Sequence, residues 1–376
     1  MKIGIVGAGI AGLALGNALV QRGVDVEIFE RSARVRAGGS GITLAPNGLA
    51  ALDALGLGER FRALQEQQLP LRGGLKDPRG TWLSRIPAEV TTQSLAISRA
   101  KLHELLKDGL PDGSLHTGVE VVGANPETGE IELASGETRK FDLVVGADGI
   151  NSSVRRSCFD DPGTRYAGYN AWRAIAPKIV GLEFGSETWG SKARFGVVPL
   201  QDGSTYWFAV KTGPEAPAGA EETHPDALKD AFNHWHYPIP QLIAATPEQD
   251  IQFLPIRELA SPLPSYTNGR VVLVGDAAHA MTPNLGQGAC QGLEDVAVLA
   301  DLLGGAGDGT VDDTLDLALY DQQRVKRSQR IARQSRLVGD VAHTGGHRVA
   351  WLRNRVLQAT PDALTERQTK RVTDWR

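Results

Sequence analysis

Three glycines near the start of the chain have the spacing of a phosphate-binding turn. Gly7, Gly9 and Gly12 stand between two apolar runs. In a βαβ unit the first glycine allows a tight turn, the second lets the backbone approach a pyrophosphate, and the third lets the helix pack closely on the sheet. Glu30 ends the next strand, at the distance typical of a carboxylate that binds an adenosine ribose. The motif predicts a dinucleotide site that prefers an unphosphorylated ribose 2′-hydroxyl, as in FAD or NAD.

The same stretch has two other interpretations. Residues 3–20 contain one clearly polar side chain, Asn17, so they also resemble a membrane span or a signal peptide. The glycines would weaken a lipid-facing helix, and residues 24–28 alternate as a strand does. A glycine turn can also bind nothing. The agreement of strand, turn, helix and Glu30 favours a nucleotide site.

Two acidic turns later in the chain also follow strands. Asp148 comes after the strand of residues 142–146, and Asp276 comes after a later strand. Ligands of open α/β sheets lie beyond the carboxyl ends of the strands, where both turns would fall. Asp276 can accept hydrogen bonds from the ribityl hydroxyls of a flavin, and the free N–H groups of residues 286–289 can hold a pyrimidine carbonyl or an anionic reduced flavin. Each turn alone could be a stop signal with Asp as a helix cap, but together they indicate FAD.

The pattern between these motifs predicts an inserted sheet. Short alternating runs separated by Gly, Pro and Asp turns occupy residues 166–261, with one helical insert near residues 225–236. Residues 69–85 resemble further strands of the same sheet. Residues 269–275 form a buried, parallel-type strand that returns the chain to the nucleotide domain, and a mostly helical tail follows.

We therefore expect an α/β fold: a Rossmann-like FAD-binding domain of the GxGxxG type with an inserted, mostly β substrate domain and a C-terminal helical segment. The expected boundaries are 1–68, 95–165 and 262–340 for the discontinuous FAD-binding domain, 69–94 and 166–261 for the substrate domain, and 341–376 for the helical tail.

Composition excludes several classes of protein. With 376 residues, 41% hydrophobic and 22% charged, the chain has the size and composition of an ordinary globular protein of two packed domains. Its formal net charge of −4 gives no general attraction to nucleic acid or anionic membrane, so any basic surface would be local. The cations between Arg324 and Arg336 alternate with apolar residues at helical spacing, which favours a solvated helix face over a nucleic-acid contact.

The two cysteines, Cys158 and Cys290, have neither metal-ligand spacing nor the pattern of a disulfide framework. We expect them to be small buried residues in a reducing compartment, and no secretory leader is evident. The sequence therefore predicts a cytoplasmic protein with no metal site, no integral membrane segment and no nucleic-acid partner.

These motifs give the chain a resemblance to a known enzyme family. It resembles the class A flavoprotein monooxygenases, the single-component FAD-dependent aromatic hydroxylases with the para-hydroxybenzoate hydroxylase fold. The resemblance covers nearly the whole chain and rests on residues 7–12 with Glu30, on Asp148 with Gly149, and on residues 275–279 with Pro283. Within the family, residues 40–48, 166–169 and 283–290 are most similar to the group of urate hydroxylase, salicylate hydroxylase and zeaxanthin epoxidase.

The resemblance implies a set of FAD contacts. The pyrophosphate would be contacted by Gly7, Gly9, Ala11 and Gly12, and the adenosine end by Glu30 and Arg31 at the ribose and Val121 at the adenine. Thr43 would lie near the flavin chain, Arg99 would contact the diphosphate or ribityl, and Asp148 would serve both FAD and the pyridine nucleotide. The isoalloxazine end would be contacted by Asp276, Gly286, Gln287, Gly288 and Ala289. Arg99 also has a plain interpretation as a charge at a helix start.

The resemblance also implies the reaction. NAD(P)H would reduce FAD, O₂ would add to form a C4a-hydroperoxide, and the distal oxygen would hydroxylate or epoxidise a small aromatic or polycyclic substrate. No second nucleotide fold is visible, so NAD(P)H would bind transiently as a co-substrate. Water must be kept out of such a site, and a sheet over the flavin would exclude it. A monomer or a homodimer is expected.

Three residues are candidates for the catalytic set. In the urate hydroxylase an arginine, a tyrosine and an aspartate hold or activate the substrate, and the matching positions here are Arg194, Tyr206 and Asn284. A neutral Asn cannot deprotonate a urate or phenol as a carboxylate can, so urate is not expected as the substrate. Arg194 could pair with a carboxylate or phenolate, or be an ordinary strand-surface arginine.

Strand alternation sends Tyr206 and Trp207 to opposite faces, so at most one of them meets the substrate. His279 is expected to support the turn at the end of its strand rather than act as a general base.

Two other functions are compatible with a bound flavin. One is a halogenase or reductase of the same fold, which the absence of a Lys-Trp-x-Trp-x-Ile-Pro segment disfavours. The other is a flavin-bound protein that sequesters a drug-like aromatic compound without turnover.

Overall fold

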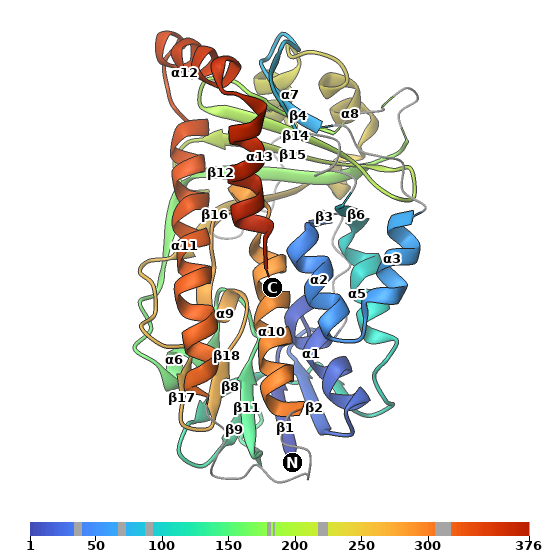
Figure 1. The fold of residues 1–376 in the computed structure, drawn as a ribbon, viewed down its shortest axis with the longest axis vertical. Coiled ribbons are helices and arrows are strands. Elements are labelled where there is room, and N and C mark those ends of the chain that lie inside the picture. Colours follow the sequence, from blue (N-terminus) through green and yellow to red (C-terminus); the bar gives the residue numbers. More distant parts are fainter. Residues whose placement is uncertain are drawn as a thin grey trace.

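The computed structural model describes residues 1–33, 40–66, 73–86, 93–178, 182, 185–216, 225–304 and 317–375. Figure 1 shows two regions stacked along the long axis, with a sheet and its helices below and a second sheet above. The helices of the C-terminal part run along one side and reach the upper end of the molecule.

The lower region is built on a six-stranded sheet. Its order is β17 (Thr267–Asn268), β18 (Val271–Leu273), β11 (Leu143–Gly146), β1 (Lys2–Val6), β2 (Asp25–Glu30) and β7 (Leu115–Thr117). All neighbouring strands are parallel except β17 and β18. The strands expected near residues 142–146 and 269–275 are confirmed, and they lie side by side next to β1. Such strands are apolar because helices cover them.

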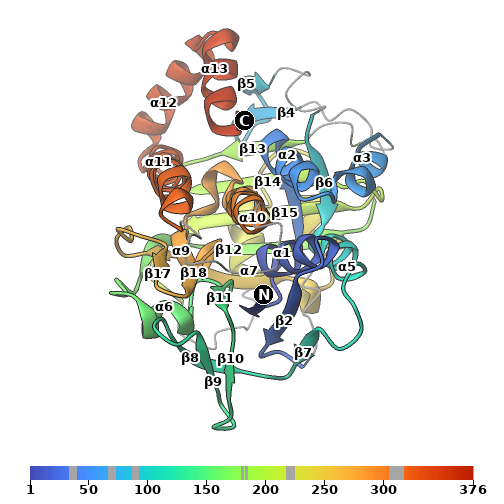
Figure 2. The ribbon, with the colours of Figure 1, turned by 60° about the horizontal axis from the view of Figure 1, so that its bottom comes forward.

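Helices pack against this sheet, as in a doubly wound fold. Helix α1 (Ile10–Gln21) packs against β1 and β2 and lies between α5 (Arg99–Lys107) and α10 (Gly288–Gly304), as Figure 2 shows. Further helices of this region are α2 (Pro46–Ala54), α3 (Gly58–Glu66), α6 (Ser153–Cys158), α9 (Asp276–His279) and the 3-10 turn η2 (Pro283–Leu285). None of the helices in the described ranges is both long enough and apolar enough to cross a membrane.

The upper region is a seven-stranded sheet, here called the roof sheet. Its order is β16 (Gln252–Leu259), β12 (Thr164–Ala176), β15 (Thr205–Thr212), β14 (Ala193–Pro199), β13 (Ser186–Trp189), β4 (Gly73–Lys76) and β5 (Trp82–Ile86). Neighbours are antiparallel except β13 and β4, which are parallel. The expectation that part of the stretch 69–85 joins this sheet is confirmed for β4 and β5.

Alternation along the roof strands separates two faces. Trp172, Phe195 and Trp207 point to the outer face, where they form a core with α7 (Pro225–Phe232) and α8 (Ile239–Ala245). The helical insert expected near residues 225–236 is therefore present, and α8 and the 3-10 turn η1 (Glu248–Asp250) extend it. The inner face is left for a cavity.

Smaller elements complete the fold. Strands β3 (Gly41–Leu44) and β6 (Leu95–Ser98) pair with each other, and β8 (Val121–Asn125), β9 (Glu130–Leu133) and β10 (Thr138–Lys140) form a three-stranded sheet. The chain ends in α11 (Ala318–Ala342), α12 (His347–Ala359) and α13 (Asp362–Thr373). The α/β class with an inserted sheet and a helical tail is confirmed, whereas the domain boundaries stay a prediction.

The expectation of a solvated helix face between Arg324 and Arg336 is confirmed for Lys326, Arg330 and Arg333, which are exposed, but it is wrong for Arg324. Arg324 lies in the interior with no exposed surface, and its guanidinium binds Glu294 and Asp295 of α10. It therefore belongs to the buried face of the helix, because α11 packs on α10 at this point. The expectation that Cys158 and Cys290 are buried is confirmed.

Candidate active site

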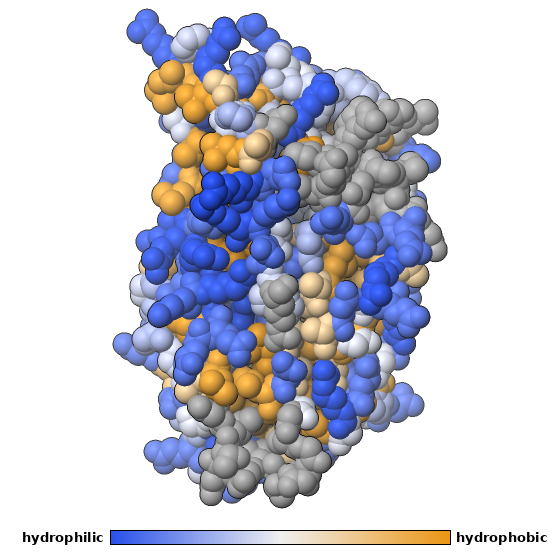
Figure 3. Space-filling model, in the orientation of Figure 1, coloured by the Kyte–Doolittle hydropathy of each residue, from blue (hydrophilic) through white to orange (hydrophobic). Residues whose placement is uncertain are grey.

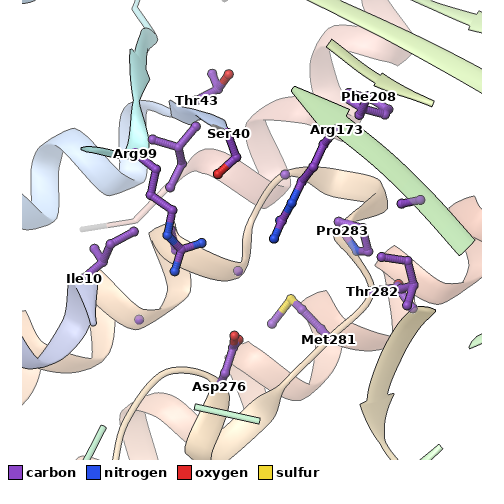
Figure 4. A pocket seen from close by; sticks show the side chains of 18 of the residues that line it. Ile10, Ser40, Thr43, Arg99, Arg173, Phe208, Asp276, Met281, Thr282 and Pro283 are labelled. Atoms are coloured by element: carbon purple, nitrogen blue, oxygen red, sulfur yellow. The ribbon is translucent and has the colours of Figure 1, made fainter. Parts of the chain in front are cut away.

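A cavity of about 420 Å³ lies between the nucleotide sheet and the roof sheet. Its floor comes from the turn after β1 and from residues 274–292, and its ceiling comes from the inner face of β12, β14, β15 and β16. Figure 4 shows Arg99 and Arg173 pointing into it from opposite sides, with Asp276 and Met281 below them. The site is therefore assembled from segments that lie far apart in the sequence.

The three glycines of the first turn have different surroundings. Gly7 has φ +104°, and a Cβ there would lie 2.4 Å from the Ala147 carbonyl oxygen. A Cβ on Gly12 would lie 2.0 Å from the Gly7 carbonyl oxygen. Gly9 has ordinary φ, and its Cβ would meet only the Ala147 oxygen at 3.9 Å. Gly7 and Gly12 are thus required by the fold, whereas Gly9 leaves room for a ligand.

The N-terminus of α1 opens into the same cavity. Gly9 is its N-cap and offers no side-chain hydrogen bond, and the first turn contains no acidic residue. Residues 9–11 line the cavity, so the free N–H groups and the positive end of the helix dipole are available to an anion. Glu30 stabilises this turn, because its carboxylate accepts hydrogen bonds from the N–H groups of Ala8 (3.0 Å) and Ser32 (2.9 Å).

Asp148 is a helix cap, the plain interpretation that the sequence left open. One carboxylate oxygen accepts hydrogen bonds from the N–H groups of Ser153 (2.7 Å) and Val154 (3.2 Å) at the start of α6. The other oxygen is buried and has no partner among the described residues. The neighbouring Gly149 has φ +78° and lines the cavity, and a Cβ there would meet nothing within 4 Å.

Residues 275–289, here called the late motif, form the wall of the cavity opposite the first turn. Gly275 has φ +61° and turns the chain sharply after β18, so that Asp276 reaches the cavity (Figure 4). Gly286 has φ +63° and turns the chain from η2 into α10. A Cβ on Gly286 would meet nothing, and one on Gly288 would meet only the Asp276 carboxylate at 4.0 Å. This wall therefore presents backbone that no side chain covers, together with the carboxylate of Asp276.

A buried ionic cluster supports the late motif from behind. Asp295 accepts hydrogen bonds from the Gly275 N–H (2.8 Å) and from His279 Nε2 (2.6 Å), and Arg324 Nε donates to it at 2.6 Å. Although its burial acts in the opposite direction, these cations and hydrogen bonds hold the pKa of Asp295 down, at about 2. His279 thus supports the turn, as expected from the sequence. Asp295 and Glu294 were not anticipated, because an acid within an apolar helix gives no signal of its buried partner.

Arg194 and Asn284 meet at the roof end of the cavity. Arg194 is 2% exposed, donating from Nη1 to Glu187 (2.9 Å) and from Nη2 to Asn284 Oδ1 (2.6 Å). The Asn284 amide also donates to the Tyr169 hydroxyl (3.0 Å) and the Ser335 carbonyl oxygen (2.8 Å). Arg194 is therefore not a surface arginine, and its charge is already matched by Glu187.

Tyr206 lies on the inner face of β15 with Phe208, and Trp207 lies in the outer core. The expectation that these neighbours face opposite ways is confirmed. Burial raises the pKa of Tyr206, so its phenol stays protonated at neutral pH. Arg173, on the same face of the sheet, donates from Nε to Gln252 at 3.1 Å. Arg173 and Glu187 could not be anticipated from the sequence, because a charged residue within a strand is usually solvated.

The cavity brings together eleven of the residues singled out from the sequence: Gly9, Ala11, Thr43, Arg99, Arg194, Tyr206, Asp276, Asn284, Gly286, Gly288 and Ala289. Seven others do not line it: Gly7, Gly12, Glu30, Arg31, Val121, Asp148 and Gln287. Val121 packs in the core of the lower region, and the Gln287 side chain is buried against Asn47. Their roles stay predictions.

These features fit a long dinucleotide with a flat ring system. Four features face one continuous cavity. They are the uncapped start of α1, Gly9 with no atom closer than 3.9 Å to a Cβ placed there, the open backbone at Gly286 and Gly288, and the Asp276 carboxylate. Among the described residues no cluster of His, Cys, Asp and Glu could hold a metal ion. The fold and the site together define a flavin-dependent oxidoreductase of the doubly wound type.

A family model described as FAD binding domain matches residues 1–335, and the chain belongs to this family. The chain is 37% identical over 382 residues to aurachin C monooxygenase/isomerase of Stigmatella aurantiaca, covering 98% of this chain and 96% of the relative. It is 35% identical to 2-heptyl-3-hydroxy-4(1H)-quinolone synthase of Pseudomonas aeruginosa, covering 99% and 97%.

Among solved structures, Klebsiella pneumoniae HpxO in complex with FAD and uric acid is similar with a TM-score of 0.88 and 26% identity, covering 99% of this chain and 96% of that one. The resemblance to the class A flavoprotein monooxygenases is confirmed. The protein is an FAD-dependent monooxygenase.

Proposed function

We propose that the protein uses a reduced nicotinamide and O₂ to hydroxylate a neutral, bicyclic, nitrogen-containing aromatic compound of the 4(1H)-quinolone type. Two relatives that match nearly the whole chain support this proposal, and one of them is named as the synthase of a 3-hydroxy-4(1H)-quinolone. We place the activity in the cytoplasm, a reducing compartment that suits the two free cysteines.

The observation that carries the substrate class is the paired state of Arg194. Its guanidinium lies at the roof end of the cavity, which Arg173 also lines, and each of its two terminal nitrogens already donates a hydrogen bond, one to Glu187 and one to Asn284. A carboxylate placed against Arg194 would have to displace Glu187 or lie beside its like charge, which is unfavourable for buried groups. A neutral ring with a carbonyl oxygen leaves this pair intact. Arg194 Nε is buried without a partner among the described residues and is the donor we assign to that carbonyl.

The cavity walls beside Arg194 are apolar, which suits a flat apolar ring as the substrate. Ala171, Val198, Phe208, Leu254 and Ile256 line the inner face of the roof sheet. Burying such a ring is favourable by roughly 25 cal/mol per Å² of apolar surface. The protonated Tyr206 phenol supplies a second polar group for orientation.

For the cofactor we propose the contacts that the family resemblance implies. The start of α1 at Gly9 and Ala11 would hold the pyrophosphate, Glu30 the adenosine ribose, Asp276 the ribityl hydroxyls, and the N–H groups of residues 286–289 the isoalloxazine end. When bound, FAD supplies hydride acceptance and oxygen activation, which no side chain can perform. This chain binds and orients the substrate, and the roof sheet keeps water away from it.

The activity is tested with the FAD-loaded enzyme. Consumption of NADH and of NADPH is followed with a 2-alkyl-4(1H)-quinolone, with benzoate and without addition, and peroxide is measured in parallel. We expect the quinolone alone to accelerate consumption, with a product heavier by one oxygen that carries label from ¹⁸O₂. Binding of the quinolone without turnover would instead indicate a sequestration protein, and acceleration by benzoate alone would overturn the proposed substrate class.

The role of Arg194 is tested with Arg194→Met. Loss of a charged donor weakens binding by about 1.5–3 kcal/mol, so the KM for the quinolone should rise about ten- to a hundredfold while FAD stays bound. Arg165→Met, on the same sheet but paired with Glu258 outside the cavity, is the matched control. An unchanged KM would remove Arg194 from the substrate site.

The placement of the cofactor is tested with Asp276→Ala. This carboxylate is exposed to the cavity, and its loss should lower FAD affinity about ten- to a hundredfold, measured by flavin fluorescence during apoprotein titration. Asp250→Ala, an exposed carboxylate on η1, should bind FAD as the unmodified protein does. Full flavin content in the Asp276 variant would contradict the placement.

A further inference from the structure

Helix α12 carries large apolar side chains that nothing in the described structure covers. Val349, Leu352 and Val356 are 50%, 57% and 59% exposed, and their spacing of three and four residues places them in one stripe. Ala350 and Arg353, on the face of the helix next to this stripe, are buried. Single exposed apolar residues are ordinary, but a continuous stripe on a helix indicates a binding surface.

A second stripe of α12 is aromatic and basic. Arg348, Trp351 and Arg355 follow the same spacing, all three are exposed, and the Arg355 guanidinium lies 5.5 Å from the centre of the Trp351 ring. Tryptophan and arginine beside an aliphatic stripe are typical of helices that lie in a membrane interface.

The exposed ridge of α11 leads into this surface. Lys326, Arg330 and Arg333 are followed on the same ridge by Leu337 and Val341, which are 62% and 48% exposed. The ridge is therefore basic along its middle and apolar at the end next to α12. Figure 3 shows apolar surface gathered at the upper end of the molecule, where α12 and the end of α11 lie, with a strongly polar area below it.

Charge separates this region from the rest of the protein. Residues 318–376 contain thirteen Lys and Arg but five Asp and Glu, although the whole chain has a formal net charge of −4. The remainder of the protein therefore has a net negative charge, whereas residues 318–376 have a net positive charge, part of which is buried at Arg324 and Arg353. An anionic surface would attract this end and repel the other.

The surface is firmly attached to the fold. Arg353 Nη1 donates to the Ala342 carbonyl oxygen at 2.8 Å, and its Nη2 donates to the Gly190 carbonyl oxygen at 3.1 Å. Helices α12 and α13 also pack against β5 at the edge of the roof sheet. The apolar stripe is thus held outward by buried contacts and is not the side of a loose tail.

We propose that α12 and the end of α11 dock the protein on an anionic lipid bilayer. The stripe Val349, Leu352 and Val356 enters the interface with Leu337 and Val341, and the arginines beside it contact lipid phosphates. No described helix crosses the bilayer, so docking is peripheral and reversible. This inference does not depend on the substrate proposed above.

Charge argues against a second copy as the partner. In a two-fold dimer the same surface meets itself, which would bring Arg348 and Arg355 of one copy towards those of the other. Like charges at a desolvated contact are unfavourable. Nucleic acid would match the arginines but would leave the aliphatic stripe in water. An anionic bilayer satisfies both stripes.

The test is flotation of the FAD-loaded full chain with vesicles. One set contains phosphatidylcholine alone and the other about one third phosphatidylglycerol, each at low and high salt. We expect co-flotation with the anionic vesicles at low salt and a large loss of binding at about 1 M salt, where charges are screened within about 3 Å. Binding to neither set, or equal binding to both, overturns the proposal.

Two variants with matched controls locate the surface. Leu352→Asp and the double variant Arg330→Glu with Arg333→Glu should each lower vesicle binding at least about tenfold. Val122→Asp, an exposed apolar residue on β8 at the far end of the molecule, and Arg60→Glu, an exposed cation on α3, should bind as the unmodified protein does.

Retained flavin absorbance and an unchanged melting temperature show that each variant is folded. Unaltered binding by the folded Leu352 and arginine variants overturns the proposal. So does a dimer in analytical ultracentrifugation that Leu352→Asp dissociates while vesicles bind nothing, because a second copy would then cover the stripe.

Discussion

Gly9 and Gly12 belong to one fingerprint, yet they meet different physical demands. A side chain on Gly12 would collide with the backbone of Gly7, whereas one on Gly9 would project into the cavity. Folding therefore requires a glycine at position 12, whereas position 9 is the one where we expect a side chain to interfere with a ligand. Arg194 and Asn284 show the same principle in the roof, because each is fixed by its partners before any substrate arrives.

Alanine substitutions separate the two demands. Gly9→Ala should keep the secondary structure and melting temperature of the apoprotein but bind FAD far more weakly, because its Cβ occupies ligand space. Gly12→Ala should weaken FAD binding and, in addition, lower the free energy of unfolding by about 1–3 kcal/mol, because the 2.0 Å contact forces the turn to shift. Circular dichroism melts and flavin titration measure both. Equal behaviour of the two variants would contradict this assignment.

Asn284→Asp should destabilise the protein. The amide of Asn284 donates to the Ser335 carbonyl oxygen at 2.8 Å, and a carboxylate oxygen there would face another acceptor. We expect a loss of about 1–3 kcal/mol in urea unfolding at neutral pH, reduced by attraction to Arg194. Asn354→Asp is the control, since the Asn354 side chain accepts hydrogen bonds from Arg353 through Oδ1. A stabilised Asn284→Asp variant would show that this network is wrongly described.

Helix α11 connects the site with the C-terminal surface through His343, the residue that follows its last turn. The His343 ring stacks on Tyr169 with centroids 4.2 Å apart, and its Nδ1 lies 3.0 Å from the Thr212 hydroxyl. Its Nε2 is buried with no partner among the described residues, and Arg194 and Arg353 lie near it. Burial and these cations lower the pKa of His343 to about 3.

This geometry predicts a pH dependence with a definite sign. Since the pKa of His343 is lower in the folded state than in the unfolded state, the unfolded state binds one proton more as pH falls below about 6.5. Stability from the neutral ring is complete above that pH and decreases towards about pH 3, by up to about 1.4 kcal/mol per pH unit. Urea unfolding between about pH 7 and pH 4 should show a smaller slope for His343→Phe, which keeps the stacked ring.

Thr212→Val is the control for that experiment. It removes the same hydrogen bond but leaves the histidine, so the slope with pH should remain that of the unmodified protein. If His343→Phe and the unmodified protein lose stability in parallel over this range, His343 is not the titrating group.

Across the whole molecule, one buried cluster joins the segments that form the cavity wall at residues 274–292. Arg324 of α11 binds Asp295 and Glu294 of α10, and Asp295 binds the backbone of Gly275 at the end of β18. All three side chains have no exposed surface. The cluster thus fixes α10, α11 and the late turn relative to one another.

Removing the cation should therefore be costly. Arg324→Leu leaves two carboxylates buried with fewer partners, and we expect the free energy of unfolding to fall by about 3–5 kcal/mol. Arg62→Leu breaks an exposed pair with Asp53 and should cost less than about 1 kcal/mol. Denaturant unfolding of the apoproteins gives both values. Similar small losses in the two variants would show that the cluster does not hold the fold together.

Features that depend on local pattern were predictable from the sequence. The glycine turn, the strands at residues 142–146 and 269–275, the alternation of Tyr206 and Trp207, and the helical tail each follow from spacing within a short segment. These patterns predicted the nucleotide site, and the family resemblance that rests on them named eleven of the residues that line the cavity.

The pairing of charged and polar side chains, in contrast, depends on packing between distant segments of the chain. The bond between Arg194 and Asn284 joins residues 90 positions apart, and Arg324 reaches Asp295 across 29 positions. A buried polar or charged group is stable only when packing places a partner beside it, and a local sequence pattern does not predict which residue that partner is. For this reason the sequence grouped Arg324 with the solvated cations of its helix, whereas in the fold its side chain has no exposed surface.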